Sequence, residues 1–232
     1  MSNKKIVRLA ASEQIPTISK ELQTAADTLQ EIGWGVSVFG SARIKPDNKY
    51  YHLAEEIGRR LANAGYPVIA GGGPGIMEAA NKGAFEAGGR SVGLNIELPR
   101  ETTNNSYQTH SLQFQYFYSR KATFFMHSAA YIALPGGFGT LDEFFEAITL
   151  VQTGKNPPAP IILVGTEFWC GLIDWIKAHL STNAFISPND INLITMTDDV
   201  DTVMKMMSKC FSSLSAEESN APAALPKEIF YT

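Results

Sequence analysis

The feature that most constrains this chain is a repeated unit in which a short apolar run ends at a glycine and a helical segment follows. Four runs have this form: residues 36–39 before Gly40, 67–70 before Gly71, 131–134 before Pro135-Gly136, and 161–164 before Gly165. The runs are continuous and do not alternate with polar residues, which is typical of strands covered on both faces by helices. Residues 91–96 and 112–117 are weaker strand candidates.

Helical patterns occupy the intervals between these runs, at residues 50–63, 76–87, 120–128 and 141–151. Strand alternating with helix predicts an α/β fold, a Rossmann-like three-layer sandwich around a mostly parallel sheet. Ligands of such folds bind outside the carboxyl ends of the strands. Every glycine turn named above falls at such an end, so we expect the functional site there.

The flanking sequence suggests three parts along the 232 residues. Residues 1–34 are an N-terminal extension with a helix at 17–32, and residues 35–211 form the Rossmann-like domain. That domain closes with a short strand at 191–194 and a helix at 201–211. Residues 212–232, rich in Ser, Ala and Pro, are expected to be a flexible tail, and the polar segment 95–110 is either a lid or a loop.

Composition excludes several classes of protein. A formal net charge of −4 and a pI near 5.6 argue against a general nucleic-acid binder. The two cysteines and four widely spaced histidines give no disulfide framework and no metal site. The sequence has no signal-peptide core and no run near the roughly 20 apolar residues of a membrane span. We therefore expect a soluble, cytoplasmic protein without a metal or a membrane partner.

The strongest local signal is the turn at residues 135–140, Pro-Gly-Gly-Phe-Gly-Thr, between a buried strand and a helix. Gly136, Gly137 and Gly139 allow a sharp turn and a close approach of the backbone to a ligand. The helix N-terminus offers free N–H groups to an anion, and Thr140 adds a hydroxyl. The alternative is a tight turn in which Thr140 is the N-cap and Glu143 closes a capping box. Three glycines exceed what a cap requires, and this favours phosphate binding.

A second glycine turn, Gly-Gly-Gly-Pro-Gly at residues 71–75, also joins a strand to a helix. It lacks the Gly-Lys-Ser/Thr of a Walker A loop. It also lacks the last glycine of the dinucleotide fingerprint, because Ile76 occupies that position. Two such turns at one sheet edge suit a mononucleotide, with Gly73 in the second turn. Glu78 either binds ribose hydroxyls or a base, or is a surface glutamate that compensates the helix dipole.

Two further segments are weaker candidates. Ser41 and Arg43 follow the first strand, where Arg43 is more often a surface charge. Arg120 and Lys121 stand at a predicted helix start, where positive charge opposes the helix dipole. Either a phosphate or a carboxylate such as Glu143 uses these two charges, or they are simply exposed to solvent.

Together these residues resemble the Lonely Guy (LOG) family of nucleotide phosphoribohydrolases, often labelled lysine decarboxylase-like. The family hallmark, P-G-G-x-G-T-x-x-E, is matched without a gap from Pro135 to Glu143. The triple glycine leading to Glu78 and the Arg120-Lys121 pair match the family's other motifs. The resemblance covers roughly residues 35–180 and is closer to the longer subgroup than to the short plant-type enzymes.

The resemblance implies release of a free base and ribose 5-phosphate from an adenine nucleotide, including N6-prenylated cytokinin precursors. It implies that Arg120 and Glu143 are catalytic, and that the phosphate is held by the turn. These turn residues are Gly136, Gly137, Gly139 and Thr140. Further substrate contacts are implied for Glu78, Lys121 and Thr149, and Ser41 and Gly73 are added as binding candidates from their turns. One departure is Ala129, where many members carry an acid that could orient a catalytic group.

The resemblance also implies a homodimer or larger assembly. The reaction that it implies needs no cofactor. Decarboxylation would require a lysine bound to pyridoxal phosphate, and nothing in the sequence singles out such a lysine. The rival hypothesis is a non-catalytic carrier of a nucleotide-like molecule, such as the related molybdenum-cofactor carriers, because fold alone does not fix function.

Overall fold

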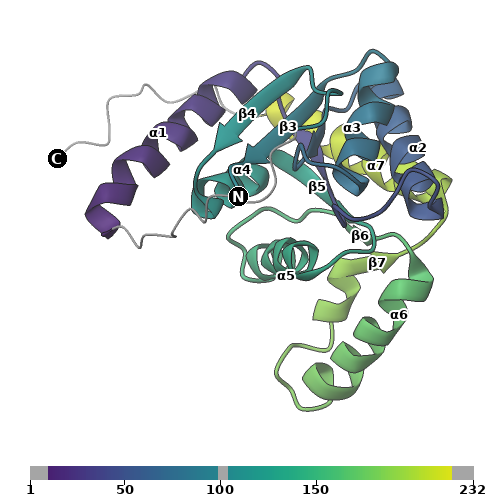
Figure 1. Cartoon of the computed structure of the whole chain (residues 1–232). Coiled ribbons are helices and arrows are strands. Elements are labelled where there is room, and N and C mark those ends of the chain that lie inside the picture. Colours follow the sequence, from purple (N-terminus) through teal and green to yellow (C-terminus); the bar gives the residue numbers. More distant parts are fainter. Residues whose placement is uncertain (1–9, 99–103, 221–232) are drawn as a thin grey trace, which may run out of the picture.

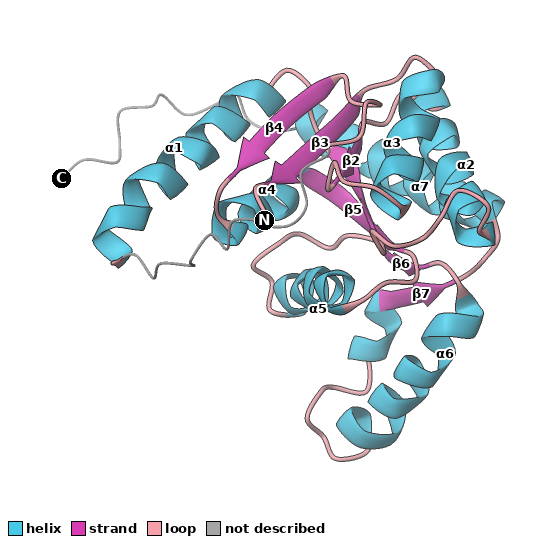
Figure 2. Ribbon diagram, in the orientation of Figure 1, coloured by secondary structure: helices cyan, strands magenta, loops and turns pink. Residues whose placement is uncertain are grey.

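The computed structural model describes residues 10–98 and 104–220. Its strands form one seven-stranded sheet in the order β4-β3-β2-β1-β5-β6-β7, and each neighbouring pair is parallel. The strands are β1 (Gly35–Phe39), β2 (Val68–Ala70), β3 (Ser91–Ile96), β4 (His110–Phe114), β5 (Ser128–Ala133), β6 (Ile161–Leu163) and β7 (Ile194–Met196). The predicted α/β fold with a parallel sheet is confirmed (Figures 1 and 2).

Helices cover both faces of the sheet and complete three layers (Figure 1). One face carries α1 (Ala11–Leu29), α4 (Phe117–His127), α5 (Phe138–Gln152) and α6 (Thr166–Trp175). The other carries α2 (Lys49–Asn63), α3 (Ile76–Glu86) and α7 (Val200–Asn220). A π-helical turn, Ile176–Ser181, continues α6, and a 3₁₀ turn, Asp190–Leu193, precedes β7. Among the helices of the described residues, none is long and apolar enough to cross a membrane.

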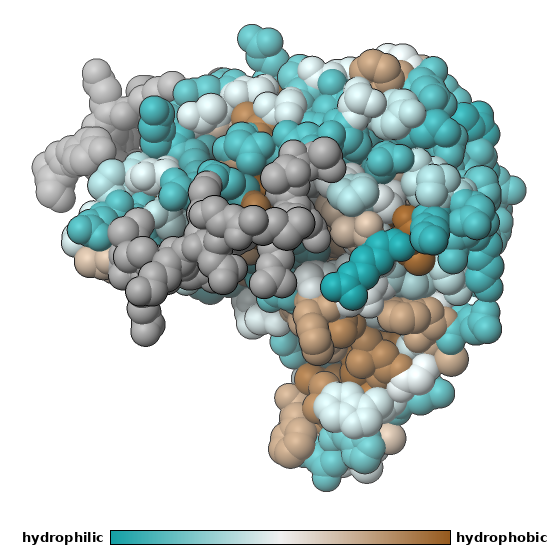
Figure 3. Space-filling model, viewed as in Figure 1, coloured by the Kyte–Doolittle hydropathy of each residue, from teal (hydrophilic) through white to brown (hydrophobic). Residues whose placement is uncertain are grey.

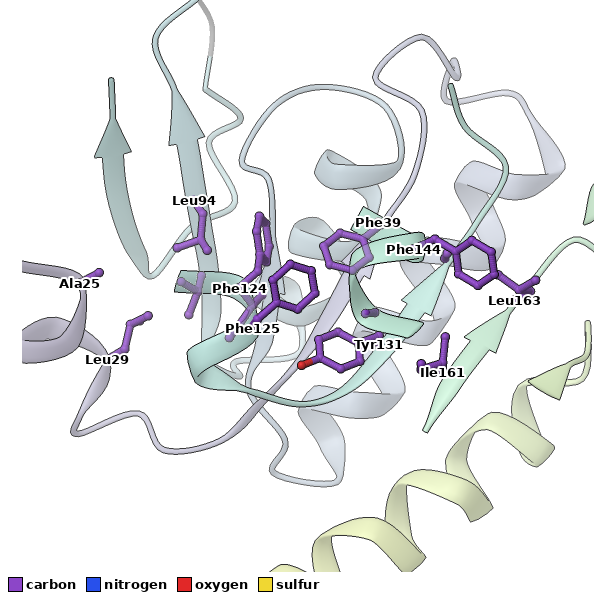
Figure 4. Close-up of a cluster of buried hydrophobic side chains, with 14 of the residues drawn as sticks. Ala25, Leu29, Phe39, Leu94, Phe124, Phe125, Tyr131, Phe144, Ile161 and Leu163 are labelled. Atoms are coloured by element: carbon purple, nitrogen blue, oxygen red, sulfur yellow. The ribbon is translucent and has the colours of Figure 1, made fainter. Parts of the chain in front are cut away.

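The core explains why the central strands are apolar at most positions. In β5, Tyr131 and Ala133 face the cluster under α1, α4, α5 and α6, whereas Ile132 faces the cluster under α2, α3 and α7. Successive side chains of a strand point to opposite faces, so a strand buried on both faces needs apolar residues throughout. Figure 4 shows the first cluster, in which Tyr131 stacks on Phe39 with ring centroids 6.4 Å apart.

The N-terminal helix begins earlier than the sequence suggests. The predicted helix was 17–32, but α1 starts at Ala11 and contains Pro16. The carboxylate of Glu13 accepts the backbone N–H of Ala10 at 3.1 Å, which satisfies an otherwise free donor and starts the helix before the proline. The helix ends before Gly33, whose φ of +75° lies in the left-handed region.

The tail prediction is wrong for residues 212–220, because α7 continues through Asn220. Serines usually disfavour a helix interior because their hydroxyls compete for backbone groups. Here Ser213 and Ser215 donate back to the carbonyls of Lys209 and Phe211, one turn earlier, and the helix persists. Residues 221–232, the remainder of that prediction, lie outside the described residues.

Two strand predictions need correction. The strand predicted at 191–194 is mostly the 3₁₀ turn, and β7 starts at Ile194, the residue that pairs with Ile161. Asp190 accepts the backbone N–H of Ser187 at 2.8 Å, which closes a turn just before the 3₁₀ segment. The strand predicted at 112–117 is β4, which ends at Phe114, and Phe117 already begins α4.

Leu29 on α1 tests whether the N-terminal helix belongs to the core. Its side chain is 1% exposed, so Leu29→Ala is expected to lower the free energy of unfolding by about 2–5 kcal/mol through lost burial and a cavity. Ile15→Ala, at a site 61% exposed on the same helix, is expected to change it by less than about 0.5 kcal/mol. Urea denaturation measures both, and equal effects would show that α1 does not pack as described.

Candidate active site

The Pro135–Thr140 turn connects β5 to α5 at the carboxyl edge of the sheet. Helix α5 begins at Phe138, and its N-cap, Gly137, has no side chain with which to cap the helix. Thr140 is therefore the third helical residue and Glu143 lies in the second turn. The capping-box interpretation of Thr140 and Glu143 is wrong for this geometry.

The turn exposes main chain rather than side chains to a ligand. Gly137 and Gly139 are exposed, and the first backbone N–H groups of a helix have no partner within it. Gly136 has no room for a side chain, since a Cβ there would lie 2.1 Å from the hydroxyl oxygen of the buried Thr140. Thr140 therefore packs into the turn, and the exposed backbone offers N–H groups of the kind that bind anions at helix N-termini.

Ser41 joins this turn to the second glycine turn. Its backbone N–H donates to the carbonyl of Pro135 at 3.1 Å, and its own carbonyl accepts the N–H of Ile76 at 3.0 Å. Gly75 has a φ of +70°, and a Cβ there would lie 2.3 Å from the Ser41 oxygen. The loops after β1, β2 and β5 thus meet at Ser41, and the two glycine turns predicted to share an edge do lie together.

Three amide side chains that the sequence did not single out hold the second glycine turn. Gln108 Nε2 and the backbone N–H of Asn105 both donate to the carbonyl of Gly72, at 3.1 and 2.8 Å. The amide of Asn105 donates to the carbonyl of Gly73 at 3.1 Å, and the buried Asn95 binds Gln108. The signal was a polar residue inside an apolar strand, followed by the polar segment 95–110. Of that segment, residues 99–103 lie outside the described residues.

Arg120 lies between the two glycine turns and is 5% exposed. Because α4 begins at Phe117, Arg120 is in the second helical turn rather than at the helix start. Its Nε donates to the carbonyl of Leu94 at 2.6 Å, and its Nη2 donates to that of Gly71 at 3.3 Å. A Cβ on Gly71 would lie 2.3 Å from that Nη2. The guanidinium is therefore held by a carbonyl of β3 and a carbonyl of the glycine turn after β2, and these bonds offset the cost of burying its charge.

The third partner of Arg120 is Glu143, whose Oε1 lies 3.6 Å from Nη1. Burial raises the pKa of Glu143 to about 7, although the charge of Arg120 opposes the shift. Burial also lowers the pKa of Arg120, but an arginine keeps its charge in proteins. The site therefore contains a fixed cation beside a carboxyl group that exchanges its proton near neutral pH, the range suited to general acid–base catalysis.

Other predicted site residues lie near the site but are engaged elsewhere. Lys121 pairs with two acids of α5, Asp142 at 2.7 Å and Glu146 at 2.5 Å. Glu78, in the first turn of α3, accepts the hydroxyl of Tyr51 at 2.8 Å. Lys121 thus ties α4 to α5, and Glu78 has its second oxygen left for a ligand hydroxyl.

Thr149 and Ala129 are not brought to this site within one subunit. Thr149 is exposed, donates to the carbonyl of Phe145 at 2.7 Å, and lies about 9 Å beyond Glu143 along α5. Ala129 is at the amino end of β5, roughly 20 Å along the strand direction from Pro135. The missing acid at position 129 therefore does not contact the Arg120–Glu143 pair.

A cavity of 720 Å³ lies at the opposite, amino edge of the sheet, where Ser128 and Ala129 begin β5. Its lining is mostly apolar and includes Trp34, Pro158 and Met206. Of the described residues that the motifs single out, none lines it. Because buried charge, glycine turns and a helix N-terminus converge at the carboxyl edge, we place the candidate site there and not in this cavity.

Comparison with known proteins agrees with the motifs. A family model described as "Possible lysine decarboxylase" matches residues 77–207, more than half of the chain. A cytokinin riboside 5′-monophosphate phosphoribohydrolase from Rhodococcoides fascians is 30% identical over 171 residues, covering 72% of this chain and 85% of the relative. One from Mycobacterium tuberculosis is 30% identical over 174 residues, covering 72% and 89%.

Solved structures share the fold. The protein TM1055 superposes with a TM-score of 0.58 at 25% identity, over 76% of this chain and 99% of that one. A molybdenum cofactor carrier protein from Chlamydomonas reinhardtii gives a TM-score of 0.57 at 21% identity, over 78% and 99%. At that identity the second likeness concerns the fold alone.

Fold, motifs and relatives together define an enzyme, an N-glycosyl hydrolase with a Rossmann-like fold. The chain belongs to the LOG family of phosphoribohydrolases, and the resemblance seen in its motifs is confirmed.

Gly136 and Gly137 provide a matched pair for testing the turn. Gly136→Ala is expected to lower the free energy of unfolding by about 1–3 kcal/mol, because its Cβ overlaps Thr140. Gly137→Ala is expected to change it by less than about 0.5 kcal/mol, because no atom lies within 4 Å of the added Cβ and the φ of −97° suits alanine. Thermal denaturation compares the two, and the reverse order would rule out this packing.

Proposed function

We propose that this chain hydrolyses the N-glycosidic bond of adenine nucleoside 5′-monophosphates, AMP or N6-prenylated cytokinin nucleotides, to a free base and ribose 5-phosphate. The observation that carries the proposal is the pair of Arg120 and Glu143, 3.6 Å apart with side chains 7% and 13% exposed, beside the exposed glycine turn before α5. The names of the relatives from Rhodococcoides fascians and Mycobacterium tuberculosis support the substrate class.

Substrate binding starts from the phosphate. The backbone N–H groups at Gly137 and Gly139 and the partial positive charge of the α5 N-terminus hold the phosphate, as helix N-termini hold anions. Ser41 and Gly73 border the same edge through the loops after β1 and β2. Glu78 accepts hydrogen bonds from the ribose hydroxyls with the oxygen that Tyr51 leaves free.

The reaction breaks the bond between C1′ of the ribose and the base nitrogen. As this bond lengthens, positive charge develops on the ribose, as in glycoside hydrolysis. The ionised Glu143 stabilises that charge and takes a proton from the attacking water, whose oxygen forms the new bond to C1′. The departing base takes up a proton from solvent, and Glu143 returns the proton of the attacking water to solvent, so one nucleotide and one water give the free base and ribose 5-phosphate. Arg120 holds the Glu143 carboxylate in place and favours its ionised form.

Lys121 and Thr149 remain proposed substrate contacts that need further movement or a neighbouring subunit. Lys121 is already paired with two acids, and Thr149 lies on an exposed face of α5. Apolar surface gathers over α5 and α6 (Figure 3), where Phe138, Phe145 and Phe168 are exposed. We infer that the protein is a homodimer or larger and that this surface forms the contact between subunits. Sedimentation velocity of the purified chain measures the oligomeric state.

The role of Glu143 is tested by Glu143→Gln, which keeps the shape of the side chain and removes its charge. Release of adenine from AMP, or of base from isopentenyl-AMP, is expected to fall by about 10²–10⁴-fold, the range of general acid–base catalysis. Binding of ribose 5-phosphate is expected to stay within about twofold of the parent. Chromatography of the released base and calorimetric titration measure the two quantities.

Glu56→Gln is the control for this variant, because it removes an acid paired with Arg59 on the exposed face of α2. A Glu143→Gln protein that hydrolyses as fast as the parent contradicts the catalytic assignment. Tight binding of nucleotides by the parent, without release of base from any of them, supports the carrier hypothesis instead.

The pH dependence follows from the pKa of about 7 at Glu143. The ionised carboxylate is the active form, so kcat is expected to rise about tenfold per pH unit below pH 7 and to level off above it. The ordinary pKa of a glutamate would put this midpoint near 4.5. Initial rates at saturating AMP between pH 5 and 9 measure the profile, and a flat profile across pH 6–8 contradicts the assignment.

A further inference from the structure

Helix α1 reaches the start of α4 through one carboxylate. Glu21 accepts the backbone N–H of Gln115 at 2.7 Å through one oxygen and the hydroxyl of Ser119 through the other. The N-cap of α4, Tyr116, makes no side-chain capping bond of its own. The carboxylate from α1 therefore stands at the positive end of the α4 dipole and holds both sides of the N-cap, Gln115 before it and the Ser119 hydroxyl in the first turn. Among the described residues it binds no backbone N–H of the helix itself, and Glu21 caps α4 in this wider sense only.

The rest of α1 holds Glu21 in this position. Ala25 and Leu29 follow Glu21 at intervals of four residues, so the three share one face of the helix. Ala25 and Leu29 are each 1% exposed and belong to the same buried cluster as Phe124 and Phe125 of α4 (Figure 4). Glu21 is thus the half-buried, polar end of a packed interface.

The capped segment adjoins Arg120. Ser119, whose hydroxyl meets Glu21, is the residue before Arg120, and the backbone N–H of Arg120 donates to Tyr116 at 3.2 Å. The contact between Arg120 and Glu143 is 3.6 Å long, so a small displacement of the first turn of α4 changes it substantially. The family model matches only residues 77–207, and α1 lies before that region.

From this geometry, and resting on the proposed hydrolysis, we propose that Glu21 is a positioning residue. By capping α4 from α1, it fixes Arg120 against Glu143 and thereby makes the N-terminal helix part of the catalytic apparatus. It touches neither the substrate nor the reacting atoms.

The proposal predicts a specific kinetic change in Glu21→Ala. The kcat for base release is expected to fall roughly tenfold, because displacing a catalytic group by less than 1 Å is enough for such a loss. The KM for AMP is expected to stay within about threefold, since the phosphate turn before α5 makes no contact with Glu21. Glu21→Gln, whose amide can bond both Gln115 and Ser119, is expected to recover most of kcat.

The pH profile separates positioning from a loss of folded protein. Glu143 is surrounded by Arg120 and Lys121, which lower its pKa, and by Asp142 and Glu146, which raise it. Arg120 and Lys121 both lie on α4 directly after Ser119, whereas the two acids lie on α5. A retreat of this part of α4 withdraws both cations, and it is therefore expected to move the midpoint of the kcat profile upward, by on the order of half a pH unit. A lower fraction of folded protein would reduce the rate without moving this midpoint.

Asp27→Ala is the matched control, because it removes one acid from the exposed face of α1, where its one hydrogen-bond partner within residues 10–98 and 104–220 is Gln23. Its kcat and pH midpoint are expected to equal those of the parent. Ser119→Ala removes one of the two donors to Glu21, so its effect is expected to be smaller than that of Glu21→Ala. The two changes combined are expected to cost less than the product of their separate effects.

Hydrogen exchange tests the cap without reference to activity. In Glu21→Ala the amides of residues 115–120 are expected to exchange at least about tenfold faster, with those of α5 unchanged. Unchanged exchange there, or unchanged kcat and pH midpoint, overturns the positioning role while leaving the hydrolase intact. A parent protein that releases no base overturns the proposed function, and the exchange measurement then still decides whether Glu21 caps α4.

Discussion

The structure of the site depends on one buried cation. Removing the charge of Arg120 from water costs several kcal/mol unless its N–H groups find partners. The fold supplies them from three elements, as carbonyls at Leu94 and Gly71 and a carboxylate at Glu143. Each partner is fixed by a different part of the parallel sheet or by α5. The guanidinium therefore joins three elements, namely the second glycine turn at residues 71–75, strand β3 and helix α5.

The same junction sets the chemistry. The pKa of a buried glutamate without a neighbouring cation would lie well above 7, and the pKa of a solvated glutamate would stay near its ordinary value. Burial beside Arg120 brings Glu143 to about 7. Loss of solvent raises the pKa of Glu143 and the nearby cation lowers it, so that this carboxyl group gains and loses its proton near neutral pH. Lys121, held by Asp142 and Glu146, adds a tie between α4 and α5 that keeps the two halves of the pair together.

Much of this could be predicted from the sequence, for identifiable reasons. Runs such as 131–134 have to be apolar throughout because both sides of β5 are covered, and glycine turns at strand ends mark the ligand edge. The pairing of Arg120 with Glu143 required the family motif, since 23 residues separate them and local spacing cannot place them together. Asn105 and Gln108 were missed because amides in an irregular segment carry no periodic signal, and Asn95 was missed although it interrupts the apolar pattern of β3. The extent of α7 was missed because serine composition predicts coil, whereas the hydroxyls of Ser213 and Ser215 bond back along the helix.

The tight contacts at Gly71, Gly75 and Gly136 bear on how sequences of this kind can drift. At each of these positions one added carbon would strike the guanidinium, the Ser41 carbonyl or the Thr140 hydroxyl. Main-chain recognition of an anion is often thought permissive, since no side chain is required. In this protein the turns restrict the sequence instead, because a side chain at any of these three glycines would overlap neighbouring atoms. Substitutions are then tolerated best at side chains with open surroundings, such as Phe138, which lies in the turn at residues 135–140 and is 92% exposed. Divergence between members can alter the side chains around the glycine turns while the backbone of the turns stays unchanged.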